Sequence, residues 1–261
     1  MIKFLELVKS AFVILTISFI FSVIGVFAVY STLSQHEVPY NHQIRDNTNP
    51  SNYYNVSFKN TIKKSRLSTV QVVSIFPEEE MISTSSGTYF ESYGSYFVVS
   101  VAHGLGGPCE NTKIVVDGSV YSCIKYIEVD QNYDYAIIQT EKIKSRKPIK
   151  IPQDLPKNKE WLKSLSLLNK VVYTGYPNNL GALTISGEIS GFSSSEHVYI
   201  ISYAWQGSSG SGVFDHSGKY IGYVVAVDVG QTDLGVQILQ NVVLVMPAYK
   251  IDWTKAITEA E

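Results

Sequence analysis

Short segments of alternating apolar and polar residues, separated by turn residues, constrain this 261-residue chain more than any other feature. An apolar residue at every second position is typical of a strand with one buried face, whereas a helix repeats its apolar residues every three or four positions. Six such segments precede residue 142, the usual number of strands in one small antiparallel barrel. We expect these strands at 66–76, 87–91, 95–101, 113–116, 120–129 and 135–140.

A second set of six segments lies between residues 166 and 247. The expected strands are 170–174, 182–192, 198–202, 212–215, 220–228 and 234–245. Residues 143–165 predict a polar connector with three prolines and a helical turn near Trp161, and residues 248–260 predict a closing helix after Pro247. The sequence therefore predicts an all-β chain of two six-stranded antiparallel β-barrels, at about 66–142 and 166–247, with a C-terminal helix.

Residues 205–214 read WQGSSGSGVF and place Ser209 between glycines, just before an apolar strand. Glycine on both sides lets the backbone turn sharply and lets a substrate carbonyl approach the N–H groups of Gly207 and Ser209. Such a run is also typical of a flexible turn between strands. Ser211 is a second candidate, but it lacks the paired upstream glycine at the right offset.

A serine nucleophile needs a base, and His103 is the candidate because it ends the apolar run 95–102 and precedes Gly104. The other reading is a histidine that closes a strand and bonds a nearby carbonyl. The four remaining histidines lie in a polar tract or beside turns: His36, His42, His197 and His216.

Asp134 is the candidate acid, since it stands directly before the apolar segment 135–138. A solvated turn aspartate is the alternative reading. Asp130 competes for the role four residues earlier, and Asp117 fits a hairpin turn better.

Taken together, VAH at 101–103, DYAII at 134–138 and GSSGS at 207–211 resemble the three motifs of the trypsin-like, chymotrypsin-fold PA-clan serine peptidases. The HtrA-like bacterial branch is the most similar, because the 31 residues from position 103 to 134 and the 75 from 134 to 209 suit its compact form. The resemblance covers about residues 66–253 and predicts a peptidase domain at 66–261 without a PDZ module.

The resemblance implies a serine endopeptidase, a hydrolase that works through an acyl-enzyme with no cofactor and no metal. It implies His103, Asp134 and Ser209 as catalytic triad, with an oxyanion hole formed by the N–H groups of Gly207 and Ser209. It also implies that strand 222–227 lines the substrate backbone. Tyr203 is expected at the base of the specificity pocket, and the remaining expected substrate-binding residues are Ala204, Val225, Ala226 and Val227. This apolar lining predicts small or hydrophobic residues before the cleaved bond.

Two positions depart from the family pattern. Ser208 stands where many relatives have Asp or Asn, so activation by a freed N-terminus is not expected. Val225 replaces a hydroxyl residue that often supports the catalytic aspartate. The alternative function is therefore a catalytically inactive pseudo-peptidase that acts as a membrane-tethered protein-binding module.

The N-terminus predicts a membrane anchor at residues 10–30, because residues 11–30 carry no charge and twenty helical residues span about 30 Å. Lys3 and Lys9 precede it, so residues 1–9 are expected in the cytoplasm and the peptidase domain in the periplasm or outside the cell. A weak cleavage signal at 26–28 leaves open a secreted form after signal-peptide removal.

Residues 31–65 are rich in Asn, Ser and Tyr and predict a polar linker, with an arm packed on the barrel as the alternative. Cys109 and Cys123 are the only cysteines. They are expected to pair in an oxidising compartment and to stay free in a reducing one.

The formal net charge is −2, and the only contiguous basic stretch is 142–150. This distribution argues against a nucleic-acid surface. The expected partners are a protein or peptide substrate and the membrane, and the sequence does not indicate an oligomeric state.

Overall fold

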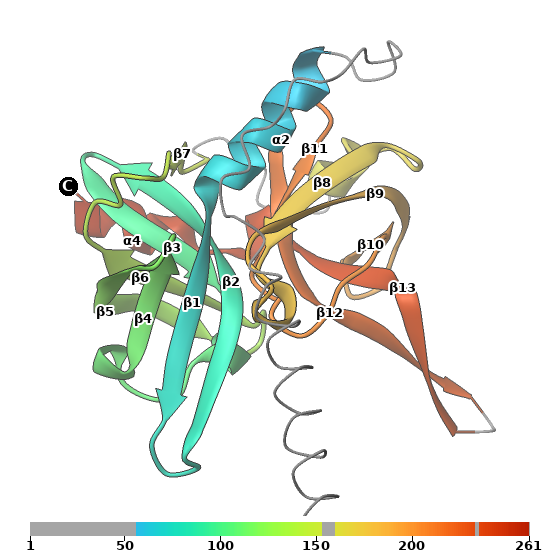
Figure 1. The fold of residues 1–261 in the computed structure, drawn as a ribbon. Coiled ribbons are helices and arrows are strands. Elements are labelled where there is room, and N and C mark those ends of the chain that lie inside the picture. Colours follow the sequence, from blue (N-terminus) through green and yellow to red (C-terminus); the bar gives the residue numbers. More distant parts are fainter. Residues whose placement is uncertain (1–55, 153–159, 233–234, 261) are drawn as a thin grey trace, which may run out of the picture. The chain divides into compact units, whose positions relative to one another are not determined.

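The structure, a computed structural model, describes residues 56–152, 160–232 and 235–260 (Figure 1). Six strands form the first barrel in the order β1-β4-β5-β6-β3-β2, which a β1–β2 pairing closes. Their bounds are β1 (Thr69–Phe76), β2 (Met81–Ser92), β3 (Ser95–Ser100), β4 (Thr112–Val116), β5 (Ser119–Asp130) and β6 (Tyr135–Thr140).

The second barrel is closed in the order β10-β13-β12-β11-β8-β9, and all its neighbouring strands are antiparallel. Its strands are β8 (Lys170–Gly175), β9 (Leu183–Phe192), β10 (Val198–Ile201), β11 (Gly212–Asp215), β12 (Tyr220–Thr232) and β13 (Gly235–Pro247). The two predicted six-stranded barrels are confirmed.

β2 begins at Met81, six residues before its predicted start at 87, and four of its first six residues are Ser or Thr. Ser85 and Ser86 of these six are buried. Ser85 pairs with the Ser100 hydroxyl at 3.1 Å and Ser86 donates to the Gly207 carbonyl at 2.7 Å. These hydroxyls satisfy buried polar groups, and the run of Ser and Thr at 83–86 gives no apolar signal for a strand.

One hydrophobic core is shared between the barrels. It joins Phe90 and Phe97 of barrel 1 to Phe214 and Tyr223 of barrel 2, and it includes Trp253 of the C-terminal helix. The rings of Phe90 and Trp253 lie 4.8 Å apart, centroid to centroid. Two further cores fill the individual barrels, so the shared core sets how one barrel sits on the other.

A helix precedes the first strand and corrects part of the predicted linker. Helix α2 (Val56–Ser68) occupies the last ten residues of the expected 31–65 tether and runs along the barrels (Figure 1). Phe58, Thr61 and Ser65 recur on its buried face, and the Ser65 hydroxyl bonds that of Thr174 at 2.8 Å. The sequence resembled a linker because most of the buried side chains on this face carry a hydroxyl group and are not hydrocarbon. The packed-arm alternative therefore describes 56–65.

The C-terminal segment contains a short 3₁₀ turn, η4 (Ala248–Lys250), and then α4 (Trp253–Ala260). The predicted continuous helix 248–260 is interrupted at Asp252, whose carboxylate accepts the Thr254 N–H at 3.1 Å. Aspartate at such a position is a favourable helix cap, so α4 starts there.

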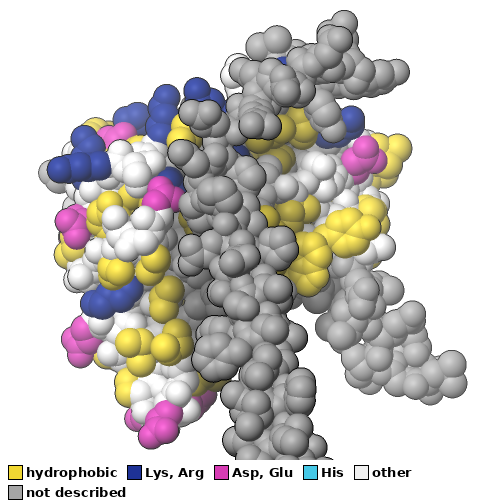
Figure 2. Space-filling model, viewed as in Figure 1, with side chains coloured by type: hydrophobic (Ala, Val, Ile, Leu, Met, Phe, Trp, Pro, Cys, Tyr) yellow, Lys and Arg dark blue, Asp and Glu magenta, His cyan; other side chains and the backbone are white. Residues whose placement is uncertain are grey.

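In the connector, β7 (Ile149–Lys150) adds to β2 in parallel, and Trp161 is fully buried in α3 (Glu160–Lys163), at the predicted helical turn. Figure 2 shows Lys and Arg side chains gathered along the upper edge over β7, where the basic stretch 142–150 lies.

The expected anchor at 10–30 lies outside the described residues. Within the part that the structure describes, no helix has the length and hydropathy to span a membrane.

Candidate active site

Three predicted residues come from three separate turns and two barrels. His103 lies in the 3₁₀ turn η1 (Ala102–Gly104) after β3, Asp134 precedes β6, and Ser209 precedes β11. His103 and Ser209 line the same groove, whose volume is about 260 Å³. The structure thus brings together side chains that are far apart in the sequence.

Asp134 holds His103 through two hydrogen bonds. Its Oδ2 lies 2.6 Å from His103 Nδ1, and its Oδ1 accepts the His103 backbone N–H at 2.8 Å. A carboxylate acceptor at Nδ1 places the ring proton there and leaves Nε2 as the proton acceptor of a neutral imidazole. The His103 side chain is 53% exposed and that of Asp134 20%, so the imidazole is open to a substrate while the acid is largely covered.

The Ser209 hydroxyl donates to the Val225 carbonyl at 2.9 Å. In the described residues, no hydrogen bond joins Ser209 to His103. Rotation between staggered χ1 positions would therefore precede proton transfer to His103. Hydrogen bonds of this kind are often absent before substrate binds.

The loop around Ser209 requires glycine at two positions. Gly207 and Gly210 have φ of +91° and +87°, in the left-handed region. A Cβ on Gly207 would lie 2.5 Å from the Tyr176 carbonyl oxygen, and one on Gly210 would lie 1.9 Å from that of Ser86. The loop thus packs directly against the backbone of both barrels.

Several carbonyl groups of this loop accept hydrogen bonds from other parts of the protein. The Gln206 carbonyl accepts the Asn178 N–H at 2.8 Å, and the Ser209 carbonyl accepts the Ser86 N–H at 2.8 Å. No described residue accepts a hydrogen bond from the N–H of Gly207 or of Ser209. Two N–H groups without an acceptor among these residues, one on the serine itself and one two residues before it, are the donors that an oxyanion hole requires.

Residues 85–222, slightly more than half of the chain, match the family described as trypsin-like peptidase domain. The chain belongs to this family. The match supports the prediction of a serine endopeptidase.

Comparison with curated proteins gives no match. Among solved structures, the active form of the Rv3671c protease from M. tuberculosis is similar with a TM-score of 0.55 and 16% identity, over 72% of this chain and 79% of that chain. The serine endoprotease from Yersinia pestis gives a TM-score of 0.56 and 16% identity, over 79% of this chain and 67% of that chain. At this identity the likeness concerns the fold.

The groove of this trypsin-like peptidase is lined by two of the three expected substrate residues whose side chains the structure describes. Ala204 and Val225 line it, and Tyr203 does not. The Tyr203 ring is 55% exposed and stacks on Trp205 at 6.1 Å. The side chains of Ala226 and Val227 lie outside the described ones. Four lining residues were missed, although all are adjacent to predicted ones: Trp205, Gln206, Ser208 and Val224.

Ser86 is a site residue of the peptidase that sequence reasoning missed. Its hydroxyl accepts the Tyr176 N–H at 2.8 Å and donates to the Gly207 carbonyl at 2.7 Å. It comes from the polar half of β2, where the sequence offered no strand signal. Ser86 thus fixes the orientation of Gly207 from the opposite barrel.

Ser211, the competing serine, is fully buried and its hydroxyl has no hydrogen-bond partner among the described residues. It does not line the groove, whereas Ser209 does. The geometry therefore favours Ser209 as the nucleophile.

Cys109 and Cys123 form a disulfide with a Cα–Cα distance of 5.5 Å. The bond joins η2 (Cys109–Asn111), which follows His103, to β5. It ties the segment after the histidine to barrel 1.

Proposed function

We propose that this chain is a membrane-anchored serine endopeptidase that cleaves peptide bonds through an acyl-enzyme, with His103, Asp134 and Ser209 as triad. One observation carries the proposal: Asp134 bonds both the ring and the backbone of a histidine that faces the same groove as Ser209. An aspartate that only belonged to a turn beside the histidine would not need to make both of these hydrogen bonds.

In the proposed reaction, Ser209 Oγ attacks the substrate carbonyl while His103 Nε2 takes its proton. His103 then gives that proton to the leaving amine, and water hydrolyses the acyl-enzyme by the same steps in reverse. Asp134 keeps the imidazole in its tautomer and stabilises the imidazolium. The free N–H groups of Gly207 and Ser209 stabilise the oxyanion.

Strand β12 is proposed to bind the substrate backbone. The register between β12 and β13 shifts between Val224 and Ala226, so Val225 has no partner residue on β13. Its carbonyl is turned to Ser209 instead. A substrate N–H that bonds this carbonyl would replace the serine hydroxyl and free it for His103.

Labelling with a fluorophosphonate probe tests the triad, because the probe reacts only with an activated serine. The full chain should label, and Ser209→Ala and His103→Ala should not. Ser211→Ala is the matched control and should label as the wild type does. Labelling that survives in Ser209→Ala and disappears in Ser211→Ala would overturn the assignment.

A second function, a pseudo-peptidase that binds a protein partner in its groove, is favoured by one observation. The Ser209 hydroxyl bonds Val225 rather than His103. A folded chain that fails to label with the probe yet binds peptides in the groove would favour this function.

The membrane anchor and the extracytoplasmic location are part of the proposal. The uncharged run 11–30 supports the anchor, and the Cys109–Cys123 disulfide agrees with an oxidising compartment. Alkaline extraction should leave the chain in the membrane fraction, and external protease should reach the domain in spheroplasts. Release of a shortened chain into the medium would favour signal-peptide cleavage.

A further inference from the structure

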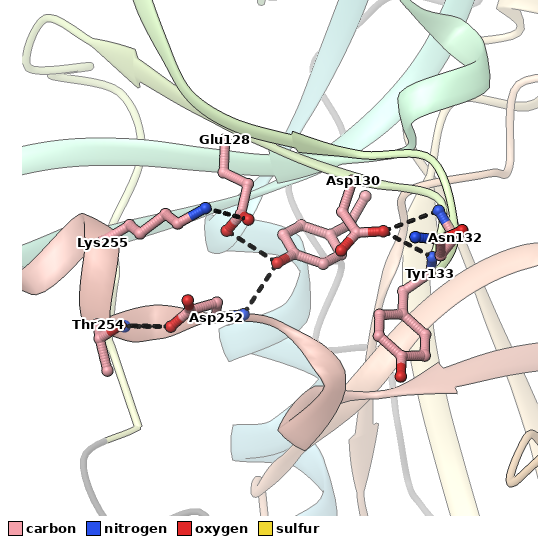
Figure 3. Close-up of polar contacts among 8 residues, drawn as sticks. Glu128, Asp130, Asn132, Tyr133, Asp252, Thr254 and Lys255 are labelled. Carbon is pink, nitrogen blue, oxygen red and sulfur yellow. Dashed lines mark hydrogen bonds and ion pairs between the residues drawn. The ribbon is translucent and has the colours of Figure 1, made fainter.

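The turn that carries Asp134 is built by a second aspartate. Asp130 Oδ1 accepts the N–H groups of Asn132 at 2.8 Å and Tyr133 at 3.0 Å (Figure 3). Asp134 itself has φ of +54°, a left-handed conformation that costs about 1–2 kcal/mol for a residue other than glycine. Surrounding contacts must hold such a residue in place.

One of these contacts comes from the other barrel. Tyr223 of β12 is fully buried, and its hydroxyl donates to the Tyr133 carbonyl at 2.6 Å. That carbonyl belongs to the peptide group whose nitrogen is Asp134 N. Because a peptide group is planar, fixing the Tyr133 carbonyl restricts the backbone orientation of Asp134.

The same strand holds the nucleophile. Val224, the next residue, accepts the Gly210 N–H at 2.7 Å and donates its own N–H to the Ser211 carbonyl at 2.9 Å. Val225 then accepts the Ser209 hydroxyl. Three consecutive residues of β12 therefore contact both the acid turn of barrel 1 and the serine loop of barrel 2.

The acid has few other supports. Within the described residues, the Asp134 carboxylate bonds only His103, and Val225 brings no side-chain hydroxyl. On the far side of the turn, the Tyr135 hydroxyl donates to Glu128 at 2.9 Å and accepts the Asp252 N–H at 3.1 Å (Figure 3). The backbone of Asp134 is thus held by hydrogen bonds of its two neighbours along the chain, at the Tyr133 carbonyl and the Tyr135 hydroxyl.

We propose that Tyr223 is a positioning residue that holds Asp134 against His103 across the barrel interface, in place of a side-chain hydroxyl on the carboxylate. The inference rests on the proposed triad. Burial raises the pKa of the Tyr223 hydroxyl well above its ordinary value, and the nearby Tyr220 and Asp134 add to the rise. The hydroxyl therefore remains a donor throughout the working pH range.

The test compares two phenylalanine variants of the full chain. Tyr223→Phe removes the hydroxyl that bonds Tyr133. Tyr220→Phe is the matched control, because Tyr220 is also buried on β12 and its hydroxyl has no hydrogen-bond partner in the described structure. We expect Tyr223→Phe to lower kcat by on the order of tenfold to a hundredfold with little change in KM, and Tyr220→Phe to leave both unchanged.

A second measurement does not depend on activity. The hydrogen bond between His103 Nδ1 and Asp134 Oδ2, 2.6 Å long, moves the NMR resonance of its ring proton downfield, so displacement of Asp134 would shift or remove that resonance. The proton NMR spectrum should therefore show this resonance shifted or lost in Tyr223→Phe and kept in the wild type and Tyr220→Phe, with the signal assigned by His103→Ala. An unchanged His103 Nδ1–H resonance in folded Tyr223→Phe would overturn the inference. Failure of the proposed function would instead appear as a wild-type chain that does not label with fluorophosphonate.

Discussion

The Ser209 hydroxyl donates its hydrogen bond to the Val225 carbonyl, 2.9 Å away. A hydrogen bond of this kind contributes about 0.5–1.5 kcal/mol net, which corresponds to at most roughly a tenfold preference for the turned position. A substrate N–H that takes the Val225 carbonyl would cancel this preference. The orientation of the Ser209 hydroxyl toward Val225 is therefore compatible with catalysis once substrate binds.

Gly207→Ala should nearly abolish activity. Its φ of +91° disfavours any side chain, and the new Cβ would lie 2.5 Å from the Tyr176 carbonyl, so the loop must move and the Gly207 N–H with it. Loss of one oxyanion donor typically lowers kcat by about 10²–10³-fold, which steady-state peptide hydrolysis would detect.

Gly94→Ala is the matched control for this change. Gly94 also has positive φ, at +84°, but a Cβ there would meet nothing within 4 Å. It should cost about 1–2 kcal/mol of unfolding free energy and leave kcat unchanged. Equal losses of activity in the two glycine variants would contradict the proposed role of Gly207.

Ser86→Ala should lower both stability and activity, whereas Ser85→Ala should lower stability alone. It leaves the Tyr176 N–H and the Gly207 carbonyl without their common partner, at a cost of about 1–3 kcal/mol, and it releases Gly207 from barrel 1. Ser85→Ala removes a buried hydroxyl whose partner among the described residues is the Ser100 hydroxyl. We expect both variants to unfold at lower denaturant concentration, and only Ser86→Ala to react more slowly with the fluorophosphonate probe.

The strands were predictable because each buried face leaves a two-residue period of apolar residues, and β6 and β11 match their predicted bounds. Where hydroxyl groups fill a buried face instead, the period disappears. This explains why the first half of β2 and the buried face of α2 were missed.

The same distinction applies to the site. His103, Asp134 and Ser209 could be selected because each stands at the end or beginning of an apolar strand. Ser86 and Tyr223 could not, since their contacts depend on how one barrel sits on the other. For a related reason the stacking of the Tyr203 ring on Trp205 was not predictable, because the distance of Tyr203 from Ser209 along the chain says nothing about this contact.

The groove predicts the residue preferred before the cleaved bond. Its side walls include Ala204, Val224 and Val225, and among the lining residues only His103 is titratable. A charged side chain would lose hydration there without a partner, at a cost of several kcal/mol. A peptide-library profile should therefore favour small or hydrophobic residues, and one dominated by Lys, Arg, Asp or Glu would refute this view of the groove.

Alkaline pH should unfold the chain through its buried tyrosines. Burial raises the pKa of Tyr89 from 10.0 to about 12, partly offset by the hydrogen bond from the Ile143 N–H. Since the folded pKa lies above the unfolded one, this contribution is fully present below pH 10 and is lost as the pH rises toward 12. Burial raises the pKa values of Tyr173 and Tyr223 in the same direction, so their contributions to stability are lost over an overlapping or higher pH range.

Urea unfolding at pH 8, 10 and 11, followed together with phenolate absorbance, tests this prediction. The free energy of unfolding should be constant up to about pH 10 and should fall above it. A chain equally stable at pH 8 and 11 would show that these tyrosines have the same pKa in the folded and unfolded states, which would contradict the prediction.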